Sequence, residues 1–451
     1  MNEVALETQR RDQPLIEDKS PSIRNSDVRW LIILLAALSG IADYTTFNLI
    51  ESFEYLLIPL LDVSKEKFDE LYFIGPEVNI VVSVLAGLLI DRVGLKTPYH
   101  WFAVLVIIGQ IIVTVGVGLL SWWLVFIGRA ISSLGGPSLL VARTVIVAKW
   151  FIGKELSFAL GAPILLMELG RFTGFYMVLW VWNWSYQLYL GFLTGVIGCC
   201  LSWYAVFHLC DWDEFACNEE VDRNRRESSQ PEKLKLRDLK KLKPMYFLII
   251  IIIALLSAAF LGFTYDPSGI VNRFGYIPEY RDVLFSLITF WIPAFVTPLF
   301  GLYIDKKGKR LQYLLIAFGV FLVANFIVTC IPDQTPQGIV AFFVALVGIS
   351  FSVQQAITWP CIAMMISERL LGTAFGLSYS LANLTTWAWA KFDPIPKIGT
   401  FWNGILITGV VLAAVAVVIL LSLETQRKRA HLEKPSTKRR DVPGFEGRQD
   451  D

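Results

Sequence analysis

The chain has 451 residues, of which 55% are hydrophobic and 18% are charged, and its mean hydropathy is +0.55. A soluble domain carries about 25% charged residues, so this composition excludes an ordinary soluble globular protein. The formal net charge of +1 gives no reason to expect a nucleic-acid partner. The six cysteines lack metal-ligand spacing, so the sequence indicates neither a metal site nor a disulfide framework.

Apolar stretches of roughly 20 residues recur along the chain, and about 20 residues cross a bilayer core of ~30 Å. The 29 residues before the first stretch are polar and lack the apolar core of a cleavable signal peptide. We therefore expect the first span to direct membrane insertion. The sequence predicts twelve spans, over residues 30–50, 68–90, 98–120, 122–148, 155–180, 186–209, 245–265, 283–304, 311–331, 338–363, 371–390 and 399–422.

These spans divide the chain into five parts, because a polar segment separates the first six spans from the last six. The predicted parts are an amino-terminal tail (1–29), a six-helix bundle (30–210), a central loop (211–244), a second six-helix bundle (245–422) and a basic carboxy-terminal tail (423–451).

Positive charge predicts the orientation of the spans. Of the 40 lysines and arginines, 31 lie on the side of the two tails and the central loop, and 6 lie on the opposite side. Cytosolic segments of membrane proteins carry such an excess, so both termini and the central loop are predicted to be cytosolic. Within that loop, residues 233–243 place leucines three apart among basic residues. This segment is either an amphipathic helix on anionic membrane lipid or a solvated run of charge.

A glycine- and aspartate-containing turn occurs twice, and its two aspartates are 214 residues apart. Each copy ends an apolar stretch with Gly-x-x-x-Asp-[Arg/Lys]-x-Gly-x-[Lys/Arg]. The carboxylate can accept the free N–H groups of a neighbouring helix end, and the first glycine allows two helices to approach closely. The second glycine allows a tight turn. We expect two cytosolic latches that break when that side opens; a purely structural role is the alternative. Their residues are Gly87, Asp91, Arg92 and Gly94, then Gly301, Asp305, Lys306 and Gly308.

The repeated turn resembles the loop between the second and third helices of each half in the major facilitator superfamily. The resemblance implies an all-α membrane protein, with twelve transmembrane helices in two pseudo-symmetric six-helix bundles. It implies transport by alternating access, with no enzymatic activity and no cofactor. Within the superfamily, residues 29–422 resemble the lysosomal dipeptide transporters. The strings that carry this likeness are residues 135–139, 150–156, 272–276, 359–360, 368–376 and 383–384.

The likeness to lysosomal dipeptide transporters implies a small-molecule substrate, a dipeptide or an amino-acid-like zwitterion, moved by uniport. It implies the lysosomal membrane, with the plasma membrane as the alternative, and Asp12, Leu15 and Ile16 resemble an acidic dileucine sorting signal. It also implies a glycosylated lysosomal accessory membrane protein, because we expect neither glycosylation pattern, at Asn183 or Asn383, to be used. A proton-coupled symporter of another solute and a non-transporting sensor or scaffold remain alternatives. The oligomeric state stays open.

Ionisable residues inside the spans are the candidate substrate-binding residues, because a charge at mid-membrane costs about 2.5–3.5 kcal/mol. Asp43 and Glu168 lie ~20 Å from the cytosolic ends of their spans, and Arg171 follows one helical turn after Glu168. A site of mixed charge suits a zwitterion. In the alternative interpretation, Glu168 and Arg171 neutralise each other. The predicted cavity is lined by Asp43, Gln110, Arg143, Glu168, Arg171, Gln354 and Asn383.

The candidate site departs from the family that it resembles. An acidic residue on the fourth span and an arginine on the fifth are expected there, but the corresponding residues here are Pro137 and Glu168. Arg143 or Arg171 can supply the missing positive charge from another turn, so dipeptide selectivity does not follow from the resemblance. Asp43 or Glu168 can carry a proton if burial raises its pKa.

Overall fold

The computed structural model describes most of the membrane-spanning part of the chain. The predicted sorting residues Asp12, Leu15 and Ile16 lie outside the described residues, as does the basic segment 233–243. The described residues are 23–224 without 186, 244–265, 291–332, 335–392, 409, 411, 413–420 and 422.

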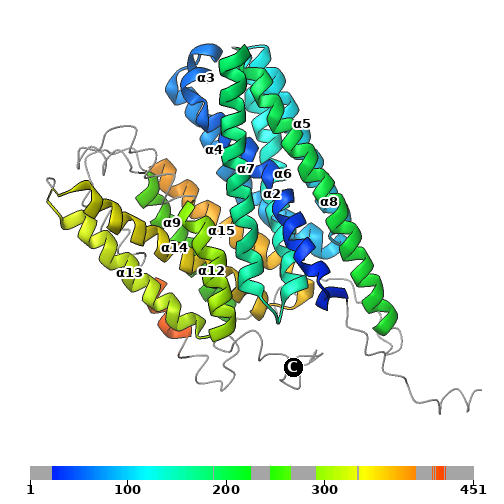
Figure 1. Ribbon diagram of the computed structural model, residues 1–451, viewed down its shortest axis with the longest axis vertical. Helices are drawn as coiled ribbons and strands as arrows, with labels where there is room; N and C mark the ends of the chain where they lie inside the picture. The colour runs from blue at the N-terminus through cyan, green and yellow to red at the C-terminus, as the bar shows by residue number, and fades with distance from the viewer. Residues whose placement is uncertain are drawn as a thin grey trace, which may run out of the picture.

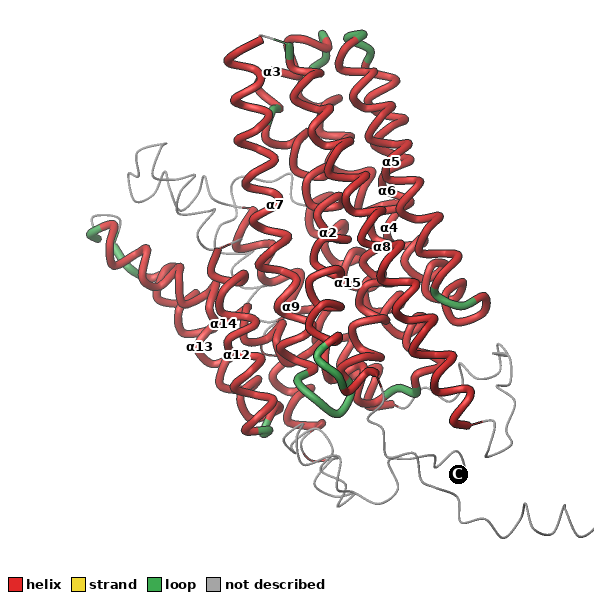
Figure 2. The backbone as a smooth tube through the Cα atoms, turned by 45° about the vertical axis from the view of Figure 1, so that its right-hand side comes forward, coloured by secondary structure: helices red, strands yellow, loops and turns green. Residues whose placement is uncertain are grey.

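Every regular element in these ranges is a helix, and Figure 2 shows the helices joined by short loops, with no strand in the described part. The elements are η1 (Ile23–Asn25), α2 (Val28–Ser52), α3 (Glu54–Leu61), α4 (Lys65–Val93), α5 (Lys96–Gly118), α6 (Trp122–Phe151), α7 (Leu156–Ser185), α8 (Leu188–Asn224), α9 (Pro244–Tyr265), α12 (Ile292–Lys307), α13 (Arg310–Cys330), α14 (Gln337–Met365), η5 (Glu368–Leu370) and α15 (Leu371–Phe392).

The long helices agree with the predicted spans. By length and composition, six described helices are apolar enough to cross a membrane, and three further apolar stretches are shorter. The six are α4, α5, α6, α8, α13 and α14, and the shorter stretches lie in α2, α7 and α9. Of the predicted twelfth span, residues 413–420 are described as a continuous helical segment.

The structure corrects two boundaries. Helix α8 continues to Asn224, whereas the sixth span was predicted to end at residue 209. The polarity of Asp211 and Glu214 suggested a loop, but both carboxylates lie close to Nζ of Lys96, at 3.5 and 2.5 Å. The ion pairs keep this part of the helix packed against α5 on the surface. The short helix α3, which contains Pro59, was not predicted.

The helices form two groups, α2–α8 and α9 with α12–α15, which we call the N-terminal and C-terminal halves. The end that carries the loops after α4 and α12 is the predicted cytosolic side, and we call it the cytosolic end. The halves are closest there and diverge toward the opposite end (Figure 1). Helix α4 packs against α15, and α7 packs against α12; smaller contacts of α7 with α14 and of α6 with α15 also join the halves.

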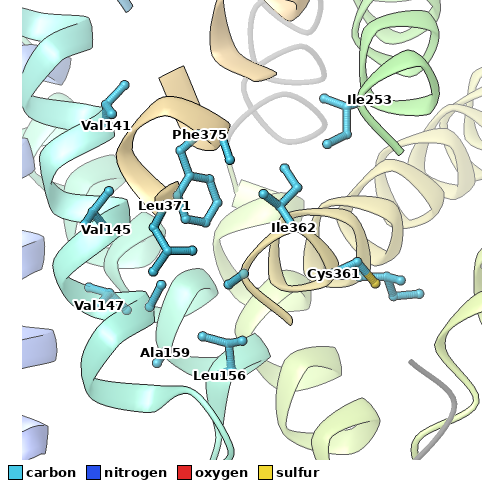
Figure 3. Close-up of a cluster of buried hydrophobic side chains, with 14 of the residues drawn as sticks. Val141, Val145, Val147, Leu156, Ala159, Ile253, Cys361, Ile362, Leu371 and Phe375 are labelled. Atoms are coloured by element: carbon cyan, nitrogen blue, oxygen red, sulfur yellow. The ribbon is translucent and has the colours of Figure 1, made fainter. Parts of the chain in front are cut away.

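A buried apolar core continues from one half into the other. Val141 and Val145 of α6 lie beside Leu371 and Phe375 of α15, with Ile362 of α14 next to them (Figure 3). Burial of such side chains contributes about 1.5–3 kcal/mol each where they leave water. This core holds the halves together on the cytosolic side of the region where they diverge.

Candidate functional site

The Asp91 carboxylate of α4 binds the amino-terminal end of α15. Its Oδ1 accepts the backbone N–H of Gly372 at 2.9 Å, and its Oδ2 accepts the backbone N–H of Thr373 at 2.6 Å. The Thr373 hydroxyl also donates to Oδ2, at 2.7 Å. The first N–H groups of a helix lack partners within the helix and carry a partial positive charge, which a carboxylate satisfies. We call this contact between the halves the Asp91 latch.

The Asp305 carboxylate of α12 repeats the arrangement at the amino-terminal end of α7. Its Oδ2 accepts the backbone N–H groups of Ser157 and Phe158, at 2.8 and 3.1 Å. Its Oδ1 accepts Nη2 of Arg310 at 2.7 Å, and both of these charged side chains are buried. We call this contact the Asp305 latch.

The two latches use the last basic residue of the repeated turn differently. Arg310 points inward onto Asp305, as the ion pair above shows. Its counterpart Lys96 points outward and pairs with Glu214 on α8. Among the described residues, Asp91 accepts hydrogen bonds from neutral donors of α15, with the charge of Lys149 on α6 acting on it from beyond ion-pair distance. Asp305 differs because it has a buried cation of its own half in direct contact.

The glycines of the repeated turn allow close contact and a tight turn. A Cβ atom on Gly301 would lie 2.7 Å from the backbone oxygen of Ser157, and a Cβ on Gly87 would overlap the carbonyl oxygen of Gly372. The second glycines end α4 and α12 with positive φ, 94° at Gly94 and 72° at Gly308. Such angles strain any residue with a side chain. The basic residues Arg92 and Lys306 are exposed beside the turns.

A third contact between the halves lies deeper, between α6 and α15. The hydroxyl groups of Thr144 and Tyr379 are 3.0 Å apart. The Tyr379 ring stacks on Trp359 of α14 at a centroid distance of 4.2 Å, and Trp359 also donates its ring N–H to Gln355. No role was predicted for the hydroxyl groups of Thr144 and Tyr379, because hydropathy cannot tell that these polar atoms face the other half.

Arg143 lies between three helices of the N-terminal half. Its guanidinium group touches Gly40 of α2, and its Nη1 is 2.8 Å from Sδ of Met167 on α7. A thioether sulfur is a weak acceptor. The residue is 5% exposed, and among the described residues it makes no ion pair with a carboxylate. The predicted residue Glu168 directly follows Met167 and is also buried.

Three other predicted residues occupy different surroundings. The amide of Gln110 is buried between α5 and α8, where it donates to the carbonyl oxygen of Phe192 at 3.2 Å. The amide of Gln354 is buried without a hydrogen-bond partner in the described part. Asn383 is half-buried and donates to the carbonyl oxygen of Tyr379 one turn earlier in α15, at 2.8 Å.

The backbones of Asp43 and Arg171 lie on α2 and α7, as expected, but their side chains are outside the described part. Arg129 is buried on α6, and its Nη1 lies 3.5 Å from the carbonyl oxygen of Thr46, a contact that braces α6 on α2. In the described part, no group of three or more histidine, cysteine and acidic residues could hold a metal ion.

The two helix bundles contact each other through two carboxylates, each bound to the amino-terminal end of a helix in the other half. A buried cation lies between helices further from the cytosolic end. This arrangement defines a membrane transport protein rather than an enzyme. The family model described as the Major Facilitator Superfamily matches residues 69–390. The chain belongs to the Major Facilitator Superfamily.

Similar proteins agree with this assignment. The lysosomal dipeptide transporter MFSD1 of Danio rerio is 26% identical over 387 residues, which cover 81% of this chain and 82% of that protein. The lysosomal dipeptide transporter MFSD1 of Homo sapiens is 27% identical over 368 residues, or 79% and 77% of the two chains. The resemblance predicted from the sequence strings is thereby confirmed.

Solved structures support the fold. A bacterial homologue of the iron transporter ferroportin gives a TM-score of 0.68 at 12% identity, covering 88% of this chain and 100% of that chain. The proton:xylose symporter XylE gives 0.65 at 13% identity, covering 88% and 96%. The fold class predicted from the repeated turn, a major facilitator fold, is therefore confirmed.

Proposed function

We propose that the chain is a uniporter of the lysosomal membrane that moves small zwitterions carrying a carboxylate, dipeptides or amino-acid-like solutes, by alternating access. The relatives named as lysosomal dipeptide transporters support the substrate class and the membrane. The observation that carries the proposal is the buried guanidinium of Arg143, which faces a sulfur atom and, among the described residues, forms no ion pair with an acid.

A buried guanidinium without a counter-ion is costly. Removing one partner of a buried ion pair typically destabilises a protein by about 3–5 kcal/mol, because a charge stays behind without compensation. A ligand carboxylate can supply the missing anion, and it matches the two parallel N–H groups of arginine. Arg143 is therefore assigned the carboxylate of the substrate.

Glu168 is assigned the ammonium group of the substrate. It directly follows Met167 in α7, whose sulfur Arg143 contacts, so both residues belong to the region where α6 meets α7. The backbones of Asp43 and Arg171 lie on α2 and α7, and we keep both residues in the proposed site on the basis of the sequence. Gln110 is not included, because its amide serves the packing of α5 on α8.

Uniport follows from charge balance. A zwitterion brings one negative and one positive charge to Arg143 and Glu168, so the loaded site needs no added proton or metal ion. The Asp91 and Asp305 latches and the Thr144–Tyr379 contact close the cytosolic end while the other end is accessible. Breaking them lets the halves rock and exposes the site to the cytosol.

A glycosylated accessory membrane protein is part of the proposal. Asn383 lies half-buried within α15, so no glycan can be attached there in the folded state. Asn183 is exposed near the end of α7, and we expect the very short loop that follows to prevent its glycosylation. Without its own glycans, a lysosomal membrane protein needs protection from proteases, which a partner can supply.

The test uses purified protein in liposomes, with a dipeptide and the same dipeptide carrying a carboxy-terminal amide. We expect the dipeptide, but not its amide, to raise the melting temperature and to undergo counterflow. Arg143→Gln should weaken dipeptide binding at least tenfold, because a hydrogen bond to a charged group contributes about 1.5–3 kcal/mol. Arg129→Gln is the matched control on the same helix and should lower stability without changing this selectivity. Equal responses to the dipeptide and its amide would overturn the assignment.

Buried Glu168 favours one alternative, proton-coupled symport, since a carboxyl group inside a span can carry a proton. Symport predicts uptake that accelerates with an inward acid gradient and loses this acceleration in Glu168→Gln. Uniport predicts counterflow that does not depend on the gradient.

A further inference from the structure

A cluster of charged side chains lies at the cytosolic end of the N-terminal half, outside the substrate site. Lys154, in the loop between α6 and α7, donates to the backbone carbonyl oxygens of Arg24 and Trp150, the latter at 3.3 Å. Asp213 of α8 accepts the ring N–H of Trp150 at 3.1 Å and lies 3.9 Å from Nη2 of Arg24. Arg24, Lys154 and Asp213 are 6–8% exposed, and Trp150 is fully buried. We call these four residues the clasp.

Further contacts attach the segment before α2 to the same surface. The backbone N–H of Ile23 donates to Glu219 of α8 at 3.1 Å. Arg29 forms an ion pair of 3.3 Å with Glu155, and the Trp30 ring packs edge-on against Phe158 at 6.0 Å. The segment thus contacts the end of α6, the α6–α7 loop and the first turn of α7, between residues 150 and 158.

This loop leads directly into the Asp305 latch. Lys154 lies three residues before Ser157. The backbone N–H groups of Ser157 and Phe158 donate hydrogen bonds to the Asp305 carboxylate. Gly153 has a φ of 76°, so the loop makes a tight turn that only a few backbone conformations allow. The position of the α7 amino-terminal end therefore depends on what holds this turn.

The corresponding loop of the other half is held differently. Between α14 and α15 lies the short helix η5, and its Glu368 and Arg369 are exposed. The clasp consequently stabilises one of the two latches and not the other.

We propose that Arg24, Lys154 and Asp213 are positioning residues of the transport cycle, which hold the α7 amino-terminal end in register with Asp305 and thereby favour the state closed to the cytosol. The proposal rests on the alternating-access part of the proposed function. A buried hydrogen bond to a charged group fixes geometry more strongly than an exposed ion pair does. Loss of the clasp lets the α7 end tilt away from Asp305.

The test measures spin-label distances in the full-length protein, with no substrate present. One pair, at Ile152→Cys and Lys307→Cys, spans the Asp305 latch, and a second pair, at Arg92→Cys and Arg369→Cys, spans the Asp91 latch. We expect Arg24→Ala to increase the long-distance population across the Asp305 latch at least threefold. The conservative variant Arg24→Lys, which keeps a cation beside Asp213, should stay close to the wild-type distribution.

Glu214→Gln is the matched control, because Glu214 lies on the same part of α8, is exposed and pairs with Lys96 away from the loop. It should leave both distance distributions unchanged. If Arg24→Ala does not fold, Lys154→Gln removes a different contact of the clasp, the charged hydrogen bond to the backbone carbonyl oxygen of Arg24. A folded variant of either kind with wild-type distances, or with only a lower melting temperature, would overturn the proposal.

Failure of the proposed function is distinguishable from failure of the clasp. A wild-type protein that binds and moves no dipeptide would contradict the proposed substrate, but the distance shift in Arg24→Ala would still support the clasp. Substrate binding measured from the luminal side adds a second readout. Its apparent Kd should rise in Arg24→Ala in proportion to the lost fraction of the closed state.

Discussion

The hydroxyl group of Tyr379 on α15 donates a hydrogen bond to Oγ1 of Thr144 on α6, across the two halves of the molecule. The donor can be assigned because Thr144 gives its own hydrogen to the carbonyl oxygen of Leu140, at 2.7 Å. Trp359 stacks on the Tyr379 ring and restricts its movement. Thr144 directly follows Arg143 in the chain, so this contact closes the cytosolic side of the candidate site.

Removing this hydrogen bond should open the cytosolic side more often without abolishing transport. A neutral hydrogen bond contributes about 0.5–1.5 kcal/mol, so Tyr379→Phe should raise the cytosol-open population about two- to tenfold. Labelling of an engineered cysteine near the cytosolic end measures this population. Thr144→Ser keeps the acceptor and should behave as wild type. An unchanged labelling rate in Tyr379→Phe would contradict the role of the contact.

Replacing a latch carboxylate should slow the conformational cycle more than it weakens substrate binding. Asp91→Asn loses the charge that attracts the α15 amino-terminal end, and each affected hydrogen bond contributes about 1.5–3 kcal/mol. Counterflow should fall at least tenfold, while the substrate-induced rise in melting temperature persists. Arg92→Gln, at an exposed position in the same turn, is the control. Binding and flux that fall together would indicate damage to the site instead.

A methyl group at Gly301 should prevent complete closure of the cytosolic end. Its Cβ would lie 2.7–2.8 Å from the backbone of Ser157 and Phe158, which cannot move aside as a flexible side chain can. Gly301→Ala should therefore shift the distance between α7 and α12 toward longer values. Gly319→Ala on α13 meets no atom within 4 Å and serves as the control. If both variants retain wild-type distances, the close approach of α12 to α7 is not required.

A methyl group at Gly40 should weaken substrate binding without removing any charge. The added Cβ would occupy the position of the Arg143 guanidinium and of Met167, so the cation must move. Affinity for a dipeptide should fall severalfold, whereas a melting curve without ligand should change little because the arginine side chain is flexible. Isothermal titration measures the affinity. Unchanged affinity in Gly40→Ala would remove Arg143 from the site.

The sequence predicted best those features for which a local backbone structure requires one type of residue. The repeated turn predicted which aspartates follow the apolar spans, and α4 and α12 end at Gly94 and Gly308 with positive φ. The partners of those aspartates, the N–H groups at the starts of α15 and α7, are some 150 to 280 residues away in the chain. Such partners depend on the packing of whole helices, which periodicity does not determine.

The candidate site was less predictable for the same reason. Gln110 and Arg143 are both polar residues inside apolar spans, but one amide meets a backbone carbonyl of α8 and one guanidinium meets a thioether of α7. Only the neighbouring helix decides which of them is satisfied. Thr144 and Tyr379 gave no signal at all, since hydroxyl groups are common in spans and often bond to their own helix.

Arg310 points toward Asp305, so the two latch carboxylates differ in charge compensation once the cytosolic end opens. Asp305 then moves away from α7 together with the guanidinium that neutralises it. Asp91 leaves α15 without an ion pair among the described residues, and only the more distant charge of Lys149 on α6 accompanies it, so water or lipid head groups must solvate it. Separation at the Asp91 side is therefore the more ion-sensitive of the two, and cytosolic salt should influence the rate of opening mainly through that side.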